Sequence, residues 1–198
     1  MKLNDAFEHI YCINLDYRSD RWDQSVEEFA RHGIDVERFS ASTNHSVTEP
    51  YNVNPGEAGL ILTHKRLLQD AIDNGYESIL ILEDDVEFAT GFEEYLEQIP
   101  DDWDIVFLGG NHLRGIGDHV KDRIYKAYQT YACHAVGFNA RQYSHLKDRI
   151  DYTAPVDVSY ASLLDGMNSY VFKPVLAWQR PGWSDLLNSY ANYTYLRD

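Results

Sequence analysis

The sequence is short of basic residues and of long apolar runs. Only 17 Lys and Arg stand against 32 Asp and Glu in 198 residues, which gives a formal net charge of −15. Nucleic acids and anionic membranes are bound through basic patches, so we expect no nucleic-acid partner and at most peripheral membrane contact. No window approaches the ~20 apolar residues that span a bilayer, and the start, Met1 to Glu8, lacks the apolar core of a secretory signal. These absences predict a cytoplasmic protein, with the inner membrane as the only membrane surface it would visit.

Cysteine is nearly absent as well. The two cysteines, Cys12 and Cys133, each lie inside an apolar, strand-like run. Two buried, reduced thiols are therefore expected in preference to a disulfide, which fits a reducing compartment.

What the sequence does contain is enough apolar surface for a core. Apolar residues make up 44% of the chain and aromatic residues 14%, which excludes a disordered protein. The length fits one domain, and no internal repeat, low-complexity tract or Gly/Ser linker divides it. We predict a single domain over residues 1–198.

Hydrophobic patterning predicts an α/β fold with a mostly parallel central sheet flanked by helices. Strands alternate with helices in the first half of the chain, and such alternation implies parallel strands joined by crossover helices. Strands are predicted at 9–15, 36–39, 78–82, 104–108, 123–128, 130–139 and 170–175, and helices at about 22–33, 55–74, 140–150 and 156–167.

Three of the predicted strands end in polar residues. These endings are Asn14 to Arg18, Glu83-Asp84-Asp85, and Gly109 to His112. In an open parallel sheet, ligands bind outside the carboxyl ends of the strands. Three adjacent carboxylates repel one another, and a hard cation such as Mg²⁺ or Mn²⁺, which takes oxygen ligands, would compensate them. The alternative is that the triplet is solvated surface, as is common in acidic chains.

Three stretches of the sequence, Tyr11 to Arg21, Gly56 to His64 and Ile81 to Val86, carry short motifs in a fixed order. Together they resemble the motifs of glycosyltransferase family 25, which includes the lipopolysaccharide, lipooligosaccharide and collagen galactosyltransferases. Tyr11 to Arg21 resembles the opening Ile-Asn-Leu-Asp-then-Arg signature, and Gly56 to His64 is similar to the Gly-Glu-x-Gly-x-x-x-Ser-His motif, with Thr63 in place of Ser. Ile81 to Val86 looks like the Leu-Glu-Asp-Asp metal motif. The resemblance is strong over residues 8–88, and it continues faintly through Pro155-Val156-Asp157 and Gln179 to Asp185.

The resemblance implies a GT-A-type, Rossmann-like nucleotide-diphospho-sugar transferase fold. It implies a donor-binding half at about 1–112, an acceptor-side half at about 113–198, and Mn²⁺ or Mg²⁺ as cofactor. In this reading Asp85 ligates the metal directly, and Glu83 contacts the ribose or reaches the metal through water. The remaining residues expected at the nucleotide are Asn14, Arg18, His64, Asp84 and Gly109.

Some residues have a structural reading beside the functional one. Asp157 is the candidate base that deprotonates the acceptor, or an ordinary N-cap. His64 helps to organise the donor site, or is a hydrogen-bonded core histidine on an apolar helix face. His134 is a candidate third metal ligand. An aromatic C-terminal cluster stacks on sugars or serves packing; its members are Trp178, Trp183, Tyr190, Tyr193 and Tyr195.

The leading hypothesis is a metal-dependent glycosyltransferase of lipopolysaccharide biosynthesis or a related pathway. It would move a hexose, galactose being one candidate, from a UDP-sugar to a hydroxyl group of a glycan or glycoconjugate acceptor. A second hypothesis is an inactive nucleotide- or carbohydrate-binding module with the same fold. A third is a Mg²⁺-dependent phosphohydrolase, although Asn14-Leu15-Asp16 does not supply the nucleophilic Asp-x-Asp that such enzymes need after the first strand. The chain is short for the family, so an acceptor-binding region is trimmed or supplied by a partner.

Overall fold

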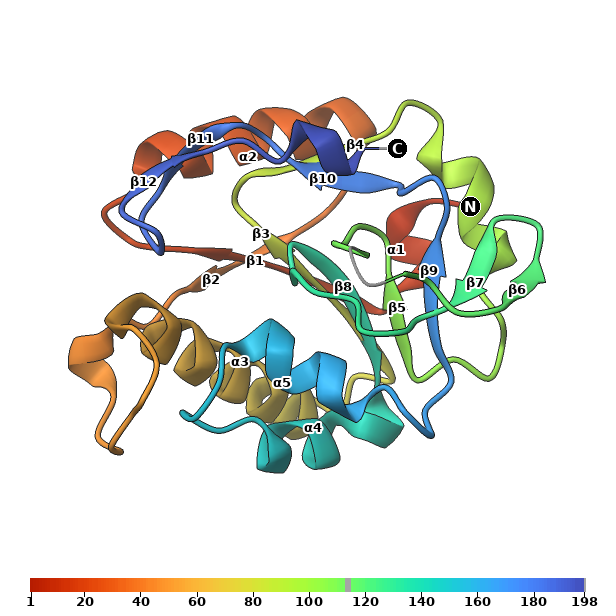
Figure 1. The fold of residues 1–198 in the computed structure, drawn as a ribbon. Coiled ribbons are helices and arrows are strands. Elements are labelled where there is room, and N and C mark those ends of the chain that lie inside the picture. The colour runs from red at the N-terminus through yellow and green to blue at the C-terminus, as the bar shows by residue number, and fades with distance from the viewer. Residues whose placement is uncertain (113–114, 198) are drawn as a thin grey trace.

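A mixed sheet of eight strands crosses the middle of the molecule in the computed structural model, which describes residues 1–112 and 115–197 (Figure 1). Its strands, in chain order, are β1 (His9–Asn14), β2 (Glu37–Ser40), β3 (Ser78–Glu83), β5 (Ile105–Phe107), β6 (His119–Lys121), β7 (Ile124–Lys126), β8 (Ala135–Asn139) and β9 (Ser169–Phe172).

The order of strands across this sheet is β2-β1-β3-β8-β5-β9-β7-β6. Strands β2, β1 and β3 pair in parallel, as do β5 and β9, whereas β8 lies antiparallel between β3 and β5. Strand β7 also runs against its neighbours. Most strands of the described sheet therefore point in one direction, which confirms the predicted α/β class and mostly parallel sheet.

Helices cover both faces of the sheet (Figure 1). Helices α3, α4 and α5 pack on one face, and α1 and α2 lie on the other, together with two small sheets that pair β10 with β4 and β11 with β12. The bounds of these elements are α1 (Leu3–Ala6), α2 (Ser19–His32), α3 (Pro55–Asn74), α4 (Tyr143–Arg149), α5 (Val156–Leu163), β4 (Val86–Phe88), β10 (Ala177–Gln179), β11 (Gly182–Ser184) and β12 (Ser189–Ala191); the 3-10 helices are η1 (Asn44–Ser46), η2 (Phe92–Gln98), η3 (Ala140–Gln142) and η4 (Thr194–Leu196).

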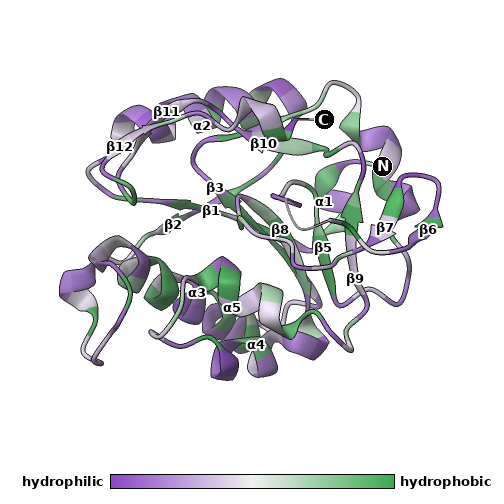
Figure 2. Ribbon diagram, in the orientation of Figure 1, coloured by the Kyte–Doolittle hydropathy of each residue, from purple (hydrophilic) through white to green (hydrophobic). Residues whose placement is uncertain are grey.

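The central strands are apolar along their whole length because both faces of the sheet are buried. Along β3, Ile79 and Ile81 belong to the core under α3 and α4, while Leu80 and Leu82 belong to the core under α1 and α2. Successive side chains of a strand point to opposite faces, so a doubly covered strand reads as a continuous apolar run. Figure 2 shows the same pattern, with hydrophobic strands inside and hydrophilic outer faces on the helices.

The long helix α3 begins and ends as the sequence predicts. Asn54 is its N-cap and accepts a hydrogen bond from the Glu57 N–H at 2.9 Å, Pro55 occupies the first turn, and Gly75 ends it in the left-handed conformation at φ 72°. A proline in the first turn and a glycine after the last turn are the usual arrangement. Gly33 ends α2 in the same way, at φ 62°.

The second half departs from the predicted bounds. The strand predicted at 130–139 begins only at Ala135, because Ala132 adopts a left-handed conformation (φ 65°) that an extended strand cannot contain. The helix predicted at 156–167 ends at Leu163, shortly before Gly166 at φ 83°. The hairpin of β11 and β12 lies in the aromatic C-terminal stretch, where no periodicity indicated a strand.

Both cysteines are buried and neither forms a disulfide, which confirms that part of the prediction. Within residues 1–112 and 115–197, no helix combines the length and apolar character needed to cross a membrane.

The sheet topology brings together the strand ends that the sequence singled out. Strands β1 and β3 are direct neighbours, with Ile13 opposite Glu83 in the register. The polar residues after β1 therefore lie beside the acidic triplet after β3.

A glycine in the centre of the sheet provides a test of this packing. A Cβ at Gly137, on β8, would lie 2.9 Å from Val106 Cγ1 and would overlap the Phe7 ring. We expect Gly137→Ala to lower the free energy of unfolding by about 1–3 kcal/mol, because overpacked cores must shift side chains or backbone. Gly182→Ala is the matched control, since its Cβ would meet no atom within 4 Å. Equal urea-unfolding curves for the two variants would contradict the described core.

Candidate functional site

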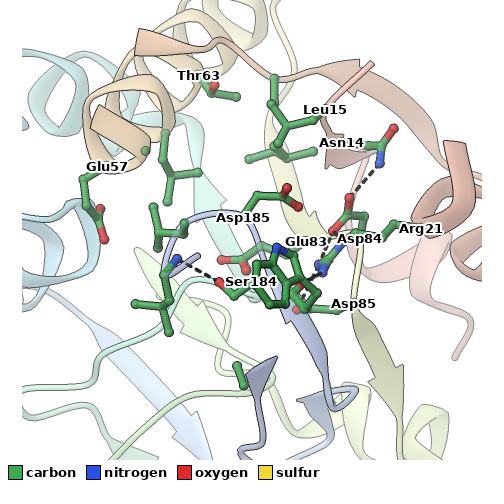
Figure 3. A pocket seen from close by; sticks show the side chains of 18 of the residues that line it. Asn14, Leu15, Arg21, Glu57, Thr63, Glu83, Asp84, Asp85, Ser184 and Asp185 are labelled. Atoms are coloured by element: carbon green, nitrogen blue, oxygen red, sulfur yellow. Dashed lines mark hydrogen bonds and ion pairs between the residues drawn. The ribbon is translucent and has the colours of Figure 1, made fainter. Parts of the chain in front are cut away.

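A cleft of about 550 Å³ opens at the carboxyl ends of β1 and β3 (Figure 3). Its walls come from both halves of the chain: the turns after β1 and β3, the first turns of α3 and α5, strand β10 and the β11–β12 hairpin. Its charged lining residues are Arg21, Glu57, Glu83, Asp84, Asp85, Asp157, Arg180 and Asp185, and its polar lining includes Asn14 and Gln179.

Asn14, the last residue of β1, is buried and has every polar atom occupied. Its Nδ2 donates to Asp84 Oδ2 at 2.6 Å and to the main-chain oxygen of Arg18 at 3.1 Å. Its Oδ1 accepts from Nε and Nη2 of Arg38 at 2.9 and 2.7 Å. Asn14 therefore fastens the acidic turn to the first strand.

Arg21, in the first turns of α2, bridges two carboxylates of the triplet. Its Nε donates to Asp84 Oδ1 at 2.6 Å, and its Nη2 lies 3.0 Å from Asp85 Oδ2 (Figure 3). Its Nη1 donates to the main-chain oxygen of Trp183 in the β11–β12 hairpin at 2.9 Å. One guanidinium thus joins α2, the acidic turn and the C-terminal hairpin.

The main chain of the acidic turn is held as firmly as its side chains. The carbonyl oxygen of Asp84 accepts from Ser25 Oγ at 2.8 Å and from Arg180 Nη2 at 3.1 Å. The carbonyl oxygen of Asp85 accepts from the Arg180 N–H at 2.7 Å. All three acids line the cleft, but both carboxylate oxygens of Asp84 are bonded within the protein, so the middle acid supports the turn.

Glu83 and Asp85 retain the capacity to bind a cation. Glu83 Oε2 accepts one hydrogen bond, from Gln179 Nε2 at 3.2 Å, and Asp85 Oδ1 is buried with no hydrogen-bond partner. Burial, followed by repulsion from Asp85 and Asp84, raises the pKa of Glu83; burial raises the pKa of Asp85 against the opposing effect of Arg21. Carboxylates placed this way gain from a bound cation.

The donor set fits a divalent cation that is shared with a ligand. Among the described residues, no group of three or more His, Cys, Asp or Glu side chains is arranged to hold a metal ion by itself. Mg²⁺ is commonly bound by one or two carboxylates together with substrate phosphates. Asp85 and Glu83 match that requirement, and His134 is not placed with them.

Two further carboxylates lie across the cleft, Asp157 in the first turn of α5 and Glu57 in the first turn of α3. Pro155, not Asp157, is the N-cap of α5, so the N-cap reading of Asp157 is wrong. Asp157 Oδ2 instead accepts from the Ala132 N–H at 3.0 Å, and its Oδ1 accepts from the Val158 N–H at 2.8 Å.

Arg18 lies beside the cleft with its guanidinium engaged. It forms ion pairs with Asp185 and, through Nη2 at 2.8 Å, with Asp20. The hydrogen bonds from Arg18 hold the pKa of Asp20 at about 2. A phosphate would have to compete with Asp185 for this arginine.

Three other predicted residues do not line the cleft. His64 is fully buried in the helix layer, with Nδ1 3.1 Å from the Tyr160 hydroxyl, and burial lowers its pKa to about 4, so it is a neutral core histidine. Gly109 is required by the protein's own packing, because a Cβ there would overlap the Ala177 oxygen and His134 Nε2. His134 is buried as well, 3.4 Å from the Ala177 oxygen.

The aromatic C-terminal cluster divides into two kinds of residue. Trp178 is a packing residue: its Nε1 donates to Glu87 at 2.9 Å, and Arg197 lies 4.7 Å from its ring centre. Trp183 and Tyr190 face one another across the β11–β12 hairpin and are 49% and 68% exposed. Trp183 and Tyr193 line the cleft.

Several residues that build the site could not be assigned a role from sequence patterns. Arg21 and Glu57 lie inside the quoted motifs, yet Arg21 meets Asp84 across 63 positions, and no spacing rule connects them. Gln179 and Arg180 lie in the faintly similar stretch from Gln179 to Asp185 but were assigned no role, and Ser25 was missed entirely. The one available signal for Ser25 was its position a helical turn after Arg21.

Comparison with known proteins places these features in a family. The model described as "Glycosyltransferase family 25 (LPS biosynthesis protein)" matches residues 7–177. A "Glycosyltransferase 25 family member" of Aedes aegypti is 29% identical over 131 residues, 54% of this chain and 22% of that protein. Human "Procollagen galactosyltransferase 2" is 26% identical over 135 residues (55% and 22%), and human "Inactive glycosyltransferase 25 family member 3" is 24% identical over 130 residues (52% and 22%).

The match therefore spans about a fifth of the length of these curated relatives. Among solved structures, "Crystal Structure of A197 from STIV" superposes with a TM-score of 0.50 at 12% identity, over 87% of this chain and 85% of that chain. That likeness concerns the fold alone.

The Arg21 bridge predicts a large stability effect. We expect Arg21→Ala to lower the free energy of unfolding by about 3 kcal/mol or more, because it leaves the buried carboxylates of Asp84 and Asp85 without the guanidinium that pairs with them. Arg149→Ala, at an exposed position on α4, is the control and should change it by less than about 1 kcal/mol. Urea unfolding at neutral pH measures both, and an Arg21 variant as stable as the control would contradict the bridge.

Proposed function

The chain belongs to glycosyltransferase family 25, and from its cleft we propose that it transfers a hexose from a UDP-sugar to a hydroxyl group of a glycan, with a divalent cation as cofactor. The observation that carries the proposal is the pair of acids at the end of β3. Asp85 keeps a buried oxygen without a partner, and Glu83 keeps lone pairs free, at the carboxyl edge of a largely parallel sheet. Ligands of such sheets bind at this edge.

On the donor side, each residue has a distinct proposed task. Asp85 would hold Mn²⁺ or Mg²⁺, and Glu83 would contact the ribose or reach the cation through water. When bound, the cation neutralises charge that develops on the departing nucleoside diphosphate. Asn14 and Asp84 contribute by keeping the acidic turn in place, and Arg18 would reach a phosphate by exchanging its Asp185 partner for it. His64 and Gly109 act through packing.

On the acceptor side, we propose that Asp157 serves as base. Its carboxylate is held by two main-chain N–H groups and lies in the cleft opposite the acidic turn. Deprotonation of the acceptor hydroxyl by a positioned carboxylate strengthens that oxygen as a nucleophile. A hydroxyl-rich, uncharged region of a glycan suits a cleft in which acids outnumber basic residues.

The identity of the sugar and of the acceptor follows from the relatives and is part of the proposal. Galactose is the candidate hexose because a relative is named a procollagen galactosyltransferase, and a lipopolysaccharide or related glycoconjugate is the candidate acceptor because the family description names its biosynthesis.

A nucleotide-binding module without turnover is the second candidate. Arg21 already compensates part of the charge of Asp84 and Asp85, and one relative is named inactive. Such a module would bind UDP and form no product. A phosphohydrolase is not favoured, since Asn14, with all its polar atoms bonded, ends the first strand where that class needs a nucleophilic carboxylate.

The cation site predicts how UDP binds. Calorimetric titration of the wild type should show tighter UDP binding with Mn²⁺ than without it, and Asp85→Ala should remove that difference because it deletes the open ligand oxygen. Asp101→Ala, a change at an exposed acid outside the cleft, is the control and should behave as wild type. UDP binding that is equal with and without Mn²⁺ in all three proteins would rule out the cation site.

If Asp157 is the base, its substitution should slow sugar transfer without weakening UDP binding. Asp157→Asn should bind UDP with wild-type affinity and transfer sugar roughly 10²–10⁴-fold more slowly, because the contribution of a positioned base is of that order. Product formation with a panel of UDP-hexoses and glycan acceptors measures the rate. Unchanged transfer would remove Asp157 as base, and UDP binding without any product from the wild type would favour the inactive module.

A further inference from the structure

Glu57 has a carboxyl group that the structure leaves partly unused. It lies in the first turn of α3, where an acidic residue is ordinarily solvated and serves the helix dipole. Here the side chain faces the cleft (Figure 3), and Oε2 is buried with no hydrogen-bond partner. The Val156 N–H, at the start of α5, supplies one hydrogen bond to the carboxyl group. A buried acceptor without a donor is costly unless a ligand completes it.

Asp157 lines the same cleft as Glu57, and both of its carboxylate oxygens are held by hydrogen bonds. Main-chain N–H groups of Ala132 and Val158 each occupy one of its oxygens. Burial, followed by repulsion from Asp157, raises the pKa of Glu57. The carboxylate of Asp157 is therefore anchored, whereas that of Glu57 has an oxygen without a partner. Catalytic carboxyl pairs commonly consist of two groups in such different environments.

The other titratable groups around this pair do not neutralise it. Cys133, before β8, is buried close enough to have its thiol pKa raised by burial and then by Asp157, Glu83 and Glu57. Glu83 faces Asp157 from the end of β3 and adds negative charge. Within the described chain, neither Glu57 nor Asp157 forms an ion pair with Lys, Arg or His. A proton is thus the available compensation for this pair.

We propose that Glu57 and Asp157 form a carboxyl dyad that receives the acceptor's proton between them, with Glu57 Oε2 as the atom that takes it. This inference rests on the proposed transferase function and adds a second catalytic residue to it. The acceptor oxygen forms a bond to the anomeric carbon, and the bond from that carbon to the diphosphate oxygen breaks, its electron pair leaving with the diphosphate. The acceptor proton passes to the dyad, whose charge falls from −2 to −1.

The dyad explains how carboxyl groups remove a proton from a sugar hydroxyl. A single exposed carboxylate is a weak base, with a pKa near 4. Two carboxylates that repel one another bind the first proton more strongly, and the protonation then belongs to the pair. Taking the proton relieves the repulsion at the moment when the acceptor oxygen becomes a nucleophile.

Four proteins test the dyad: wild type, Glu57→Gln, Asp157→Asn and the double variant. Each single variant should lower single-turnover transfer roughly 10²–10⁴-fold with UDP affinity unchanged. The double variant should be no slower than the slower single one, because residues that act as a unit are not additive. Glu27→Gln, at an exposed position on α2, is the control and should match wild type. If the rate losses of the two single variants multiply in the double variant, or if Glu57→Gln transfers sugar at the wild-type rate, the dyad is wrong.

The pH dependence provides a readout that mere packing would not change. Burial and the neighbouring charge of Asp157 raise the pKa of Glu57, so activity should fall as the pH drops through that raised pKa, since protonation removes the base. In Asp157→Asn the repulsion is gone, so the acid limb of the residual activity should move to lower pH.

A titration of the carboxyl carbons by NMR separates this inference from the function on which it rests. The Glu57 carboxyl should titrate above its ordinary range in wild type and at lower pH in Asp157→Asn, whether or not a donor has been identified. A wild type that binds UDP and transfers no sugar would end the proposed function, whereas a Glu57 titration unmoved by Asp157→Asn would end the dyad.

Discussion

The buried contact of Arg21 with Asp84 and Asp85 is the interaction on which the rest of the site depends. A parallel strand that ends in three acids concentrates charge where little water reaches it, and such charge must be paired. Arg21 pairs with the middle and last acids, Asn14 bonds the middle one from the neighbouring strand, and Arg180 and Ser25 hold the turn's carbonyl oxygens. The carboxylate of the middle acid, Asp84, therefore has a structural role. The outer acids are left with the open oxygens that a cation and a nucleotide could share.

The same contact ties the site to the C-terminal hairpin. Arg21 donates to the Trp183 carbonyl oxygen, and Arg18 pairs with Asp185, so the two arginines that follow β1 hold the segment that covers the cleft. A ligand that attracts either arginine would loosen this segment. Donor binding and the position of the hairpin are therefore expected to depend on one another, through the Arg21 hydrogen bond and the Arg18–Asp185 ion pair rather than through a change in the sheet. The net charge of −15 does not describe the cleft, which contains both acids that could bind a cation and arginines that could bind an anion.

Much of the fold could be predicted from the sequence, and the reasons for the failures are physical. The strand that contains Ile79 to Leu82 can be predicted from its apolar run, and the helix between Asn54 and Gly75 from its hydrophobic periodicity and its capping residues. These are local properties of the sequence. The antiparallel insertion of β8 depends on pairing across more than 50 residues, and the start of that strand depends on the positive φ of Ala132, where no glycine marks it. Glu83, Asp85 and Asp157 line one cleft, and their roles as cation ligands and as base stay predictions. Arg21 and Glu57 could not be assigned, because their roles arise from contacts between helices and loops far apart in the chain.

We propose that Asp85 holds a divalent cation together with a nucleoside diphosphate. Anomalous diffraction at the manganese edge, from crystals grown with UDP and Mn²⁺, tests it most directly. We expect one strong manganese peak within coordination distance of Asp85 Oδ1 and of the diphosphate oxygens, because hard cations take oxygen ligands. A diphosphate held by Arg18 or Arg21 with no manganese peak beside Asp85 would contradict it.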